Sequence, residues 1–272
     1  MSHLTSRATR LRLLVLAVVT AVSAAVIFSM DPIPQDPTYH EFADDRNLFG
    51  IPNFYNVISN LPFLLIGGAG LLRLRRRLAH PGDAAEVSET AAWLFLFLGI
   101  ALTAFGSSWY HLQPSNASLV WDRLPMTLGF MGFFAGIIGE RVGQRAYRLL
   151  LWPLVGTGVA SVLVWYAGEV QGAGDLRLYA LVQFFPLLLI PLLMAFYQPR
   201  YTGGKWVFVA LAAYAAAKAF EHYDHEIYQT LGFVSGHPLK HLVAAGGCWA
   251  LLHMFNRRQR IAELFPATSH PR

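Results

Sequence analysis

Apolar windows of membrane-spanning length follow one another along almost the whole chain. Each is close to the roughly 20 residues that a helix needs to cross a bilayer, and lipid leaves only helices or closed barrels with their backbone hydrogen bonds satisfied. The pattern predicts an all-α polytopic membrane protein, a seven-transmembrane helix bundle with one extra N-terminal span. The eight windows are 12–30, 56–73, 91–112, 119–139, 147–168, 177–197, 205–221 and 237–256.

The composition agrees with a membrane protein. Apolar residues make up 55% of the chain and charged residues only 14%, whereas charged residues are about a quarter of an ordinary soluble chain. The one cysteine, Cys248, falls in the last window. It excludes an intrachain disulfide or a thiolate cluster, and we interpret it as a small buried apolar residue.

Basic residues gather between alternate windows. The net charge is +5, and 16 of the 21 Lys and Arg fall on the same side of an eight-span arrangement. Because cytoplasmic loops are enriched in Lys and Arg, both termini are predicted to be cytoplasmic. The charge therefore reflects topology rather than nucleic-acid binding. The residues are Arg7, Arg10, Arg12, Arg73, Arg75, Arg76, Arg77, Arg141, Arg145, Arg148, Arg200, Lys205, Arg257, Arg258, Arg260 and Arg272.

This topology divides the chain into four segments. Residues 1–30 form an N-terminal transmembrane anchor or a signal-like segment, and the uncleaved anchor is favoured because cleavage after Ala24 would leave an apolar new terminus. Residues 31–55 form an acidic extracytoplasmic segment. The seven-helix core covers 56–256, and residues 257–272 form a basic cytoplasmic tail.

Polar side chains occur at the same predicted end of several windows. Ser107 and His111 lie one helical turn apart, as do His237 and His241, and Asp122 enters its helix from the same side. Ionisable groups at membrane depth are costly and indicate function. Three neutral imidazoles with an open fourth position suit a catalytic zinc ion. The pattern predicts an intramembrane metal-dependent hydrolase.

Each of these residues also has an explanation without a metal. A histidine near a helix end is commonly interfacial, and Ser107 can bond back to its own helix. Asp122 can pair with Arg123 or stabilise the start of its helix. The shared depth of the polar residues, which the charge distribution predicts independently, favours the metal site.

A second group of ligand-type residues lies in the predicted outer loop after the seventh window. Its His-x-x-His spacing has no third histidine nearby, and charged residues are common in outer loops, so we interpret the group as mainly surface. Glu221, at the helix end, is also a candidate to orient a ligand histidine. The group comprises Glu221, His222, Asp224, His225 and Glu226.

The acidic segment before the second window is a candidate calcium site. Asp44, Asp45, Asn47 and Asn53 offer hard oxygen ligands within ten residues. The spacing is not that of an EF-hand loop. The alternative is that Asn53 caps the next helix while the acids upstream are solvated.

Three blocks of sequence resemble the alkaline ceramidases, seven-span zinc hydrolases related to the adiponectin receptors. The blocks are NVISNLPF after the acidic segment, GSSWYH followed by the aspartate of DRLPM, and GHPLKH in the last window. The resemblance implies that His111, His237 and His241 are the zinc ligands and that Ser107 and Asp122 lie beside the metal. The compact loops favour a bacterial member in the inner membrane, with its active site toward the extracytoplasmic side.

The resemblance implies hydrolysis of the N-acyl bond of ceramide, or of a similar membrane lipid, to a fatty acid and a sphingoid-type amine. Zinc would lower the pKa of a bound water, Asp122 would hold or deprotonate that water, and Ser107 would donate to the oxyanion. Eukaryotic members add a calcium site, but here Asn53 stands where a glutamate is expected.

Three alternatives stay open at this point. The first is a lipase-type hydrolase that acts on another acyl lipid. The second is a seven-transmembrane receptor-like or transport protein in which the metal is structural, and a closed site with four protein ligands would favour it. The third is a metal-free helical bundle whose histidines are interfacial.

Overall fold

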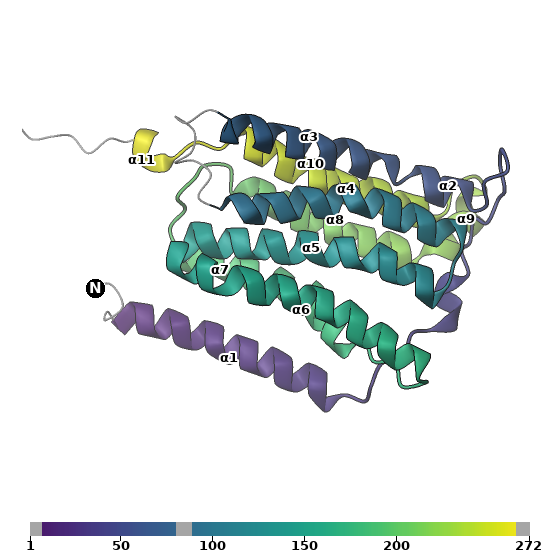
Figure 1. Cartoon of the computed structure of the whole chain (residues 1–272), viewed down its shortest axis with the longest axis horizontal. Helices are drawn as coiled ribbons and strands as arrows, with labels where there is room; N and C mark the ends of the chain where they lie inside the picture. The colour runs from purple at the N-terminus through teal and green to yellow at the C-terminus, as the bar shows by residue number, and fades with distance from the viewer. Residues whose placement is uncertain (1–6, 80–88, 265–272) are drawn as a thin grey trace, which may run out of the picture.

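The computed structural model describes residues 7–79 and 89–264, and this part of the chain is helical apart from two isolated β-bridges (Figure 1). The all-α prediction is therefore confirmed for the described residues. Residues 265–272 of the predicted basic tail, Arg272 among them, lie outside them. The elements are α1 (Arg7–Ser29), the 3-10 helix η2 (Pro37–His40), α2 (Phe54–Ile58), α3 (Leu61–Leu78), α4 (Thr90–Leu112), α5 (Asn116–Arg141), α6 (Gln144–Val170), α7 (Arg177–Phe196), α8 (Lys205–His222), α9 (Asp224–Leu231), α10 (Gly236–Arg257) and α11 (Ile261–Leu264).

Every predicted window coincides with a long helix, and the window 56–73 is divided between α2 and α3. Five helical stretches are long and apolar enough to cross a membrane, namely α1, α2 with α3, α4, α6 and α7. The helices α5, α8 and α10 have 26, 18 and 22 residues, but they carry charged and histidine side chains that lower their apolar content. The fold is compatible with an integral membrane protein, and the number of spans stays a prediction.

Local sequence explains where two of the outer elements begin and end. The Ser115 hydroxyl accepts a hydrogen bond from the N–H of Ser118 and caps α5, so this helix starts before its apolar window. The helix α9 ends at Gly232, whose φ of 73° glycine adopts without strain. The segment after α8, which we predicted to be a loop, is therefore largely helical, and that prediction was wrong.

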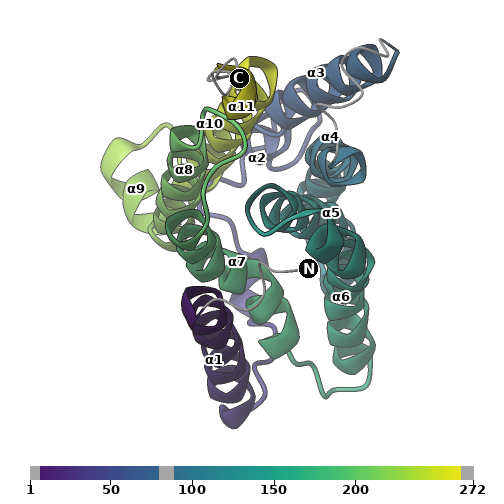
Figure 2. The same cartoon turned by 90° about the vertical axis from the view of Figure 1, so that its left-hand side faces the viewer.

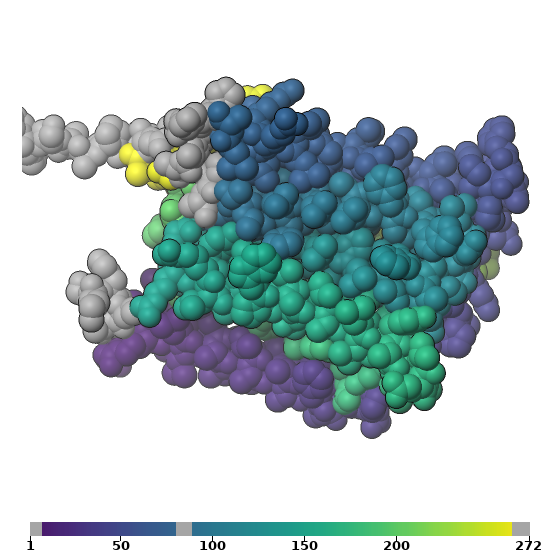
Figure 3. All heavy atoms as spheres, viewed as in Figure 1, coloured from purple at the N-terminus to yellow at the C-terminus, as the bar shows by residue number. Residues whose placement is uncertain are grey.

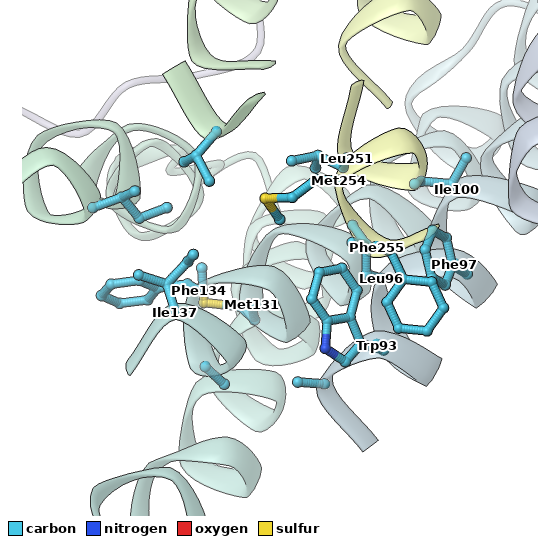
Figure 4. Close-up of a cluster of buried hydrophobic side chains, with 14 of the residues drawn as sticks. Trp93, Leu96, Phe97, Ile100, Met131, Phe134, Ile137, Leu251, Met254 and Phe255 are labelled. Atoms are coloured by element: carbon cyan, nitrogen blue, oxygen red, sulfur yellow. The ribbon is translucent and has the colours of Figure 1, made fainter. Parts of the chain in front are cut away.

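The long helices run along a common direction (Figure 1), and seen from one end α4, α5 and α6 lie on one side and α1, α7 and α8 on the other (Figure 2). We call the end that carries η2, α2 and α9 the site end, and the end at which α4 begins the opposite end. A core of aromatic and aliphatic side chains fills the bundle toward the opposite end (Figure 4). There the ring of Trp93 lies 4.7 Å from that of Phe255 and 5.9 Å from that of Phe97.

The first helix, α1, is peripheral. It forms one edge of the molecule (Figure 3), contacts α7, and has no buried residue. Its end is held by Arg177, whose guanidinium donates to the carbonyl of Met30 at 2.6 Å. An exposed apolar helix of 23 residues with so little protein contact suits a lipid environment, where apolar side chains need no protein partner.

Helices α4 and α5 approach each other closely at Gly106. A Cβ atom placed on Gly106 would lie 1.9 Å from the carbonyl oxygen of Trp121, so any larger residue would push the two helices apart. Pro125 sits four residues after Trp121 and has no N–H to offer that carbonyl. The close approach matters because Ser107 and Asp122 are the next residues along the two helices.

Candidate metal centre

The three predicted histidine ligands lie together at the site end. His111 is in the last turn of α4, and His237 and His241 are in the first turns of α10. All three are buried, and one nitrogen from each lies within 4.8 Å of the others. Among the described residues this is the group of His, Cys, Asp and Glu side chains whose geometry could hold a metal ion.

The distance between two of the ring nitrogens fits a tetrahedral metal site. His111 Nε2 and His241 Nε2 are 3.4 Å apart, and two nitrogens about 2.05 Å from a tetrahedral zinc are about 3.3 Å apart. His237 Nε2 is buried and has no hydrogen-bond partner. A buried polar atom without a partner is costly, and a metal ion bound between the rings would satisfy it.

Ser59, at the junction of α2 and α3, orients His241. Its hydroxyl lies 2.8 Å from His241 Nδ1 and 3.0 Å from the carbonyl of Asn56. If the hydroxyl donates to that carbonyl, it accepts the Nδ1–H of His241, which leaves Nε2 with a lone pair for a metal. Ser59 lies within the NVISNLPF block, but nothing in the sequence linked it to His241, and we did not predict its role.

Ser107 and Asp122 also lie at this site. Ser107 and Asp122 lie near one another, and both residues line a cavity that His241 also lines. The alternative pairing of Asp122 with Arg123 is not observed, since Arg123 turns away and donates to the side-chain oxygen of Gln35 at 2.7 Å. Asp122 is not one of the three clustered residues, and it shares the cavity with one of them, His241.

Two neighbouring cavities lie within the described bundle, and the first of them adjoins His241. The first, of about 290 Å³, is lined by polar residues that include Ser107, Asp122 and His241. The second, of about 170 Å³, is lined almost entirely by apolar residues. Phe63 and Met126 border both cavities, so the polar cavity and the apolar cavity are neighbours.

The predicted acidic segment folds back over the histidines. The ring of Phe42 lies edge-on to His111 at 4.8 Å and to His237 at 4.7 Å. The side-chain amide of Asn53 donates to the carbonyl of His111 at 2.8 Å. The segment thus shields the site from water at this end. Phe42 is not part of a periodic hydrophobic pattern in the sequence, so we did not predict it as a site residue.

Glu221 lies in a buried ion cluster and not against a histidine. Its carboxylate accepts from Lys218, from Lys240 at 2.6 Å and from the hydroxyl of Tyr39 at 2.9 Å. Burial raises the pKa of Tyr39 well above its usual range, and the nearby Glu221 adds to that rise. The hydroxyl therefore stays protonated and donates. We predicted that Glu221 orients a ligand histidine, but the hydrogen-bond partners of its carboxylate are Lys218, Lys240 and Tyr39.

The rest of the second ligand-type group divides between surface and structure. His222, His225 and Glu226 are exposed, in agreement with the surface interpretation. Asp224 is buried, and its carboxylate accepts the backbone N–H of His237 at 2.6 Å. It therefore fixes the start of α10, just where the ligand pair begins, and the surface interpretation is wrong for this residue.

The candidate calcium residues do not converge. Asp44 is buried in a bidentate ion pair with Arg46, with contacts of 2.8 and 2.6 Å. Asp45 and Asn47 are exposed, and Asn53 points its amide toward His111. A guanidinium already neutralises the one buried carboxylate, so the geometry lends calcium no support, and the calcium site stays a prediction.

Comparisons with protein-family models, with curated proteins and with solved structures each find no match to this chain. The class of the protein therefore has to be argued from its fold and its site. Those define a helical bundle, compatible with a membrane, with a possible three-histidine metal site next to a partly apolar cavity.

Proposed function

We propose that this chain is an integral-membrane, zinc-dependent amidase that cleaves the N-acyl bond of ceramide or a similar lipid. The observation that carries the proposal is the group of three buried histidines beside Ser107 and Asp122. In this proposal the seven-helix core and α1 all span a bacterial inner membrane. Both termini are cytoplasmic, and the site end faces the extracytoplasmic side.

The donor set suits zinc. Neutral imidazole nitrogens are common zinc ligands, and three of them leave a fourth position open. When bound at such a site, zinc polarises a carbonyl group and lowers the pKa of a water from about 16 to about 7. Ser59 keeps His241 in the tautomer that can bind a metal, and Phe42 limits access of bulk water to His111 and His237.

Asp122 and Ser107 have distinct roles in the proposed reaction. The Asp122 carboxylate holds the attacking water, takes its proton and later delivers a proton to the leaving amine. Ser107 donates to the substrate carbonyl as negative charge develops, a contact worth roughly 3 kcal/mol in comparable sites. Ser107 and Asp122 lie near each other in the same cavity, so in this proposal both can reach the substrate amide. Ser107 is not proposed as a nucleophile, because no free general base is available to take its proton.

The two neighbouring cavities suit an acyl lipid. The cavity of about 170 Å³ offers an apolar lining for the acyl chain, while the polar cavity of about 290 Å³ holds the amide and the headgroup. Burial of each methylene contributes about 0.8 kcal/mol, so the tail would supply much of the binding free energy.

A purely structural metal is the competing function, and the donor set argues against it. Structural zinc sites are closed by four protein ligands, whereas the group found among the described residues contains three histidines. Asp122 shares a cavity with Ser107 and His241 and is not a member of the histidine group, so in this proposal the fourth position is left to water or substrate.

Metal content and turnover on the same samples test the proposal. We expect about one zinc per chain in the wild type and its loss in His237→Ala and His241→Ala. The matched control is His253→Ala, because His253 lies on the same helix but stacks on Trp206 and Trp249 away from the site. Absence of zinc from folded wild-type protein would refute the proposal.

A second variant separates metal binding from catalysis. Asp122→Asn should abolish hydrolysis of ceramide and other N-acyl lipids while keeping zinc bound. If Asp122→Asn loses the metal, the residue is a ligand and not the base. If zinc is present but no acyl lipid is cleaved by the wild type, the structural-metal alternative is favoured.

A further inference from the structure

The polar cavity contains more basic than acidic groups. Lys218, Lys240 and Arg123 line it, whereas its carboxylates are Asp122 and Glu221. The histidines add no charge when neutral, and a bound divalent metal would make the cavity still more positive. Cations are expensive to bury without counter-charges. The excess therefore needs an explanation.

Glu221 cannot neutralise both lysines. One carboxylate carries one negative charge, and it accepts bonds from Lys218, Lys240 and Tyr39 together. An ammonium group has three N–H donors, so each lysine that bonds to Glu221 still has donors for a further acceptor. Lys240 immediately precedes His241 on α10, which keeps its charge close to the proposed metal position.

Arg123 has no carboxylate partner in the part of the chain that the structure describes. Its guanidinium is 6% exposed, donates to Gln35, and lies over the rings of Trp165 at 4.3 Å and Tyr179 at 4.7 Å. Its Nη1 atom is buried without any hydrogen-bond partner. A guanidinium fork suits a carboxylate or a phosphate. This unpartnered nitrogen is the second, independent sign of an anionic ligand.

The arrangement of the two cavities assigns the anion to one side of the scissile bond. The acyl chain takes the apolar cavity, so the amine fragment has to occupy the polar cavity, where the three cations lie. We infer that the substrate is an N-acyl lipid whose amine fragment carries a carboxylate or phosphate held by Lys218, Lys240 and Arg123. This inference rests on the proposed amidase activity, and it narrows the substrate class.

Matched substrates with one acyl chain test it. N-palmitoylglycine carries a carboxylate and N-palmitoylethanolamine is its neutral counterpart, while ceramide 1-phosphate and ceramide form the phosphate pair. With full-length, zinc-loaded protein we expect kcat/KM to be at least about tenfold higher for the anionic member of one pair. The pair that shows the preference identifies the anion. Equal rates within both pairs, or faster cleavage of the neutral lipids, would overturn the inference.

Lysine variants tie any preference to this cavity. Lys218→Met and Lys240→Met should each reduce the anionic-to-neutral ratio severalfold, and Lys240→Arg should retain most of it. Lys205→Met is the matched control, because Lys205 begins the same helix as Lys218 at its far end and should leave the ratio unchanged. A preference that survives in both lysine variants counts against the inference.

Binding separates failure of the inference from failure of the proposed function. Tryptophan fluorescence of the Asp122→Asn protein titrated with N-palmitoylglycine or N-palmitoylethanolamine reports affinity without turnover. Tenfold tighter binding of the anionic lipid supports the inference even if the wild type cleaves no amide, a result that would refute only the hydrolase. If both lipids bind equally and the wild type cleaves the amide, the proposed hydrolase activity is supported and the inference of an anionic substrate is refuted.

Discussion

Both ends of the bundle bury charged side chains, but they use them differently. At the opposite end, Glu140 lies 3.3 Å from Arg141, and Glu89 lies 3.5 Å from Arg200. The nearby cavity that Glu140 helps to line is only about 10 Å³, which holds at most about one water molecule. At the site end the charged groups instead surround a cavity of about 290 Å³.

The comparison teaches that buried charge alone does not identify a functional site. The opposite end places its ion pairs next to an aromatic core and a cavity of very small volume, which is a structural arrangement. The site end combines open space with nitrogens such as His237 Nε2 and Arg123 Nη1 that are buried without a hydrogen-bond partner. Space together with unpartnered donors and acceptors is what indicates a ligand.

The largest effect is expected for Gly106→Ala. The added methyl group would meet the Trp121 carbonyl at 1.9 Å, and backbone cannot yield as a side chain can. Separation of α4 from α5 would break the contact between Ser107 and Asp122, and misplacement by about 1 Å can cost on the order of a hundredfold in rate. We expect that loss in ceramide or N-palmitoylglycine turnover, with a lowered thermal unfolding midpoint.

Gly246→Ala is the matched control for this change. A Cβ atom on Gly246, in the same helix as His241, meets nothing within 4 Å. It should leave both turnover and the unfolding midpoint close to wild type. Full activity in Gly106→Ala would show that the close approach of α4 and α5 is not needed to hold the two catalytic side chains.

Glu221→Gln should have the next largest effect. The substitution leaves Lys218 and Lys240 without their shared counter-charge, and loss of one partner in a partly buried ion cluster costs about 2 kcal/mol. Glu140→Gln should destabilise the opposite end similarly. Only Glu221→Gln should regain stability when N-palmitoylglycine is added, as measured by thermal unfolding in detergent. Equal rescue of both variants would erase the distinction between the two ends.

Ser59→Ala should weaken zinc binding about tenfold, because loss of the group that orients a ligand histidine has effects of this order. Without the Ser59 hydroxyl, His241 Nδ1 loses its partner at 2.8 Å and the ring can adopt the wrong tautomer. Competition with a chromophoric chelator measures the change. Ser108→Ala is the control, since Ser108 contacts the carbonyl of Val57 and no histidine. An unchanged zinc affinity in Ser59→Ala would show that Ser59 does not contribute to metal binding.

The sequence predicts the helices and the histidine group well, for physical reasons. Lipid demands continuous apolar helices, so hydropathy locates them. The asymmetry of basic residues assigns His111 and the pair His237 and His241 to the same end, and the structure brings these three together. That convergence needs only helix direction and depth, which a local pattern can encode.

The remaining parts of the site depend on contacts that no local pattern encodes. Phe42 covers the histidines because a loop folds back across the bundle. The path of such a loop cannot be predicted from a repeating pattern of apolar residues. The pairing of Lys240 with Glu221 depends on the relative rotation of α8 and α10, which the sequence does not encode locally. The helix α9 was missed although Asp224 and Gly232 mark its ends, a signal that was readable.

The smallest effect is expected for Arg200→Gln at the opposite end. The Arg200 side chain is 40% exposed and its contact with Glu89 is long, at 3.5 Å. Exposed ion pairs contribute only up to about 1 kcal/mol, so the unfolding midpoint should fall slightly, and zinc content and turnover should not change. A large loss of zinc or turnover in Arg200→Gln would mean that the two ends are coupled through α4 and α5. The division between a structural end and a functional end would then fail, because charges that surround almost no space would control chemistry at the far side of the bundle.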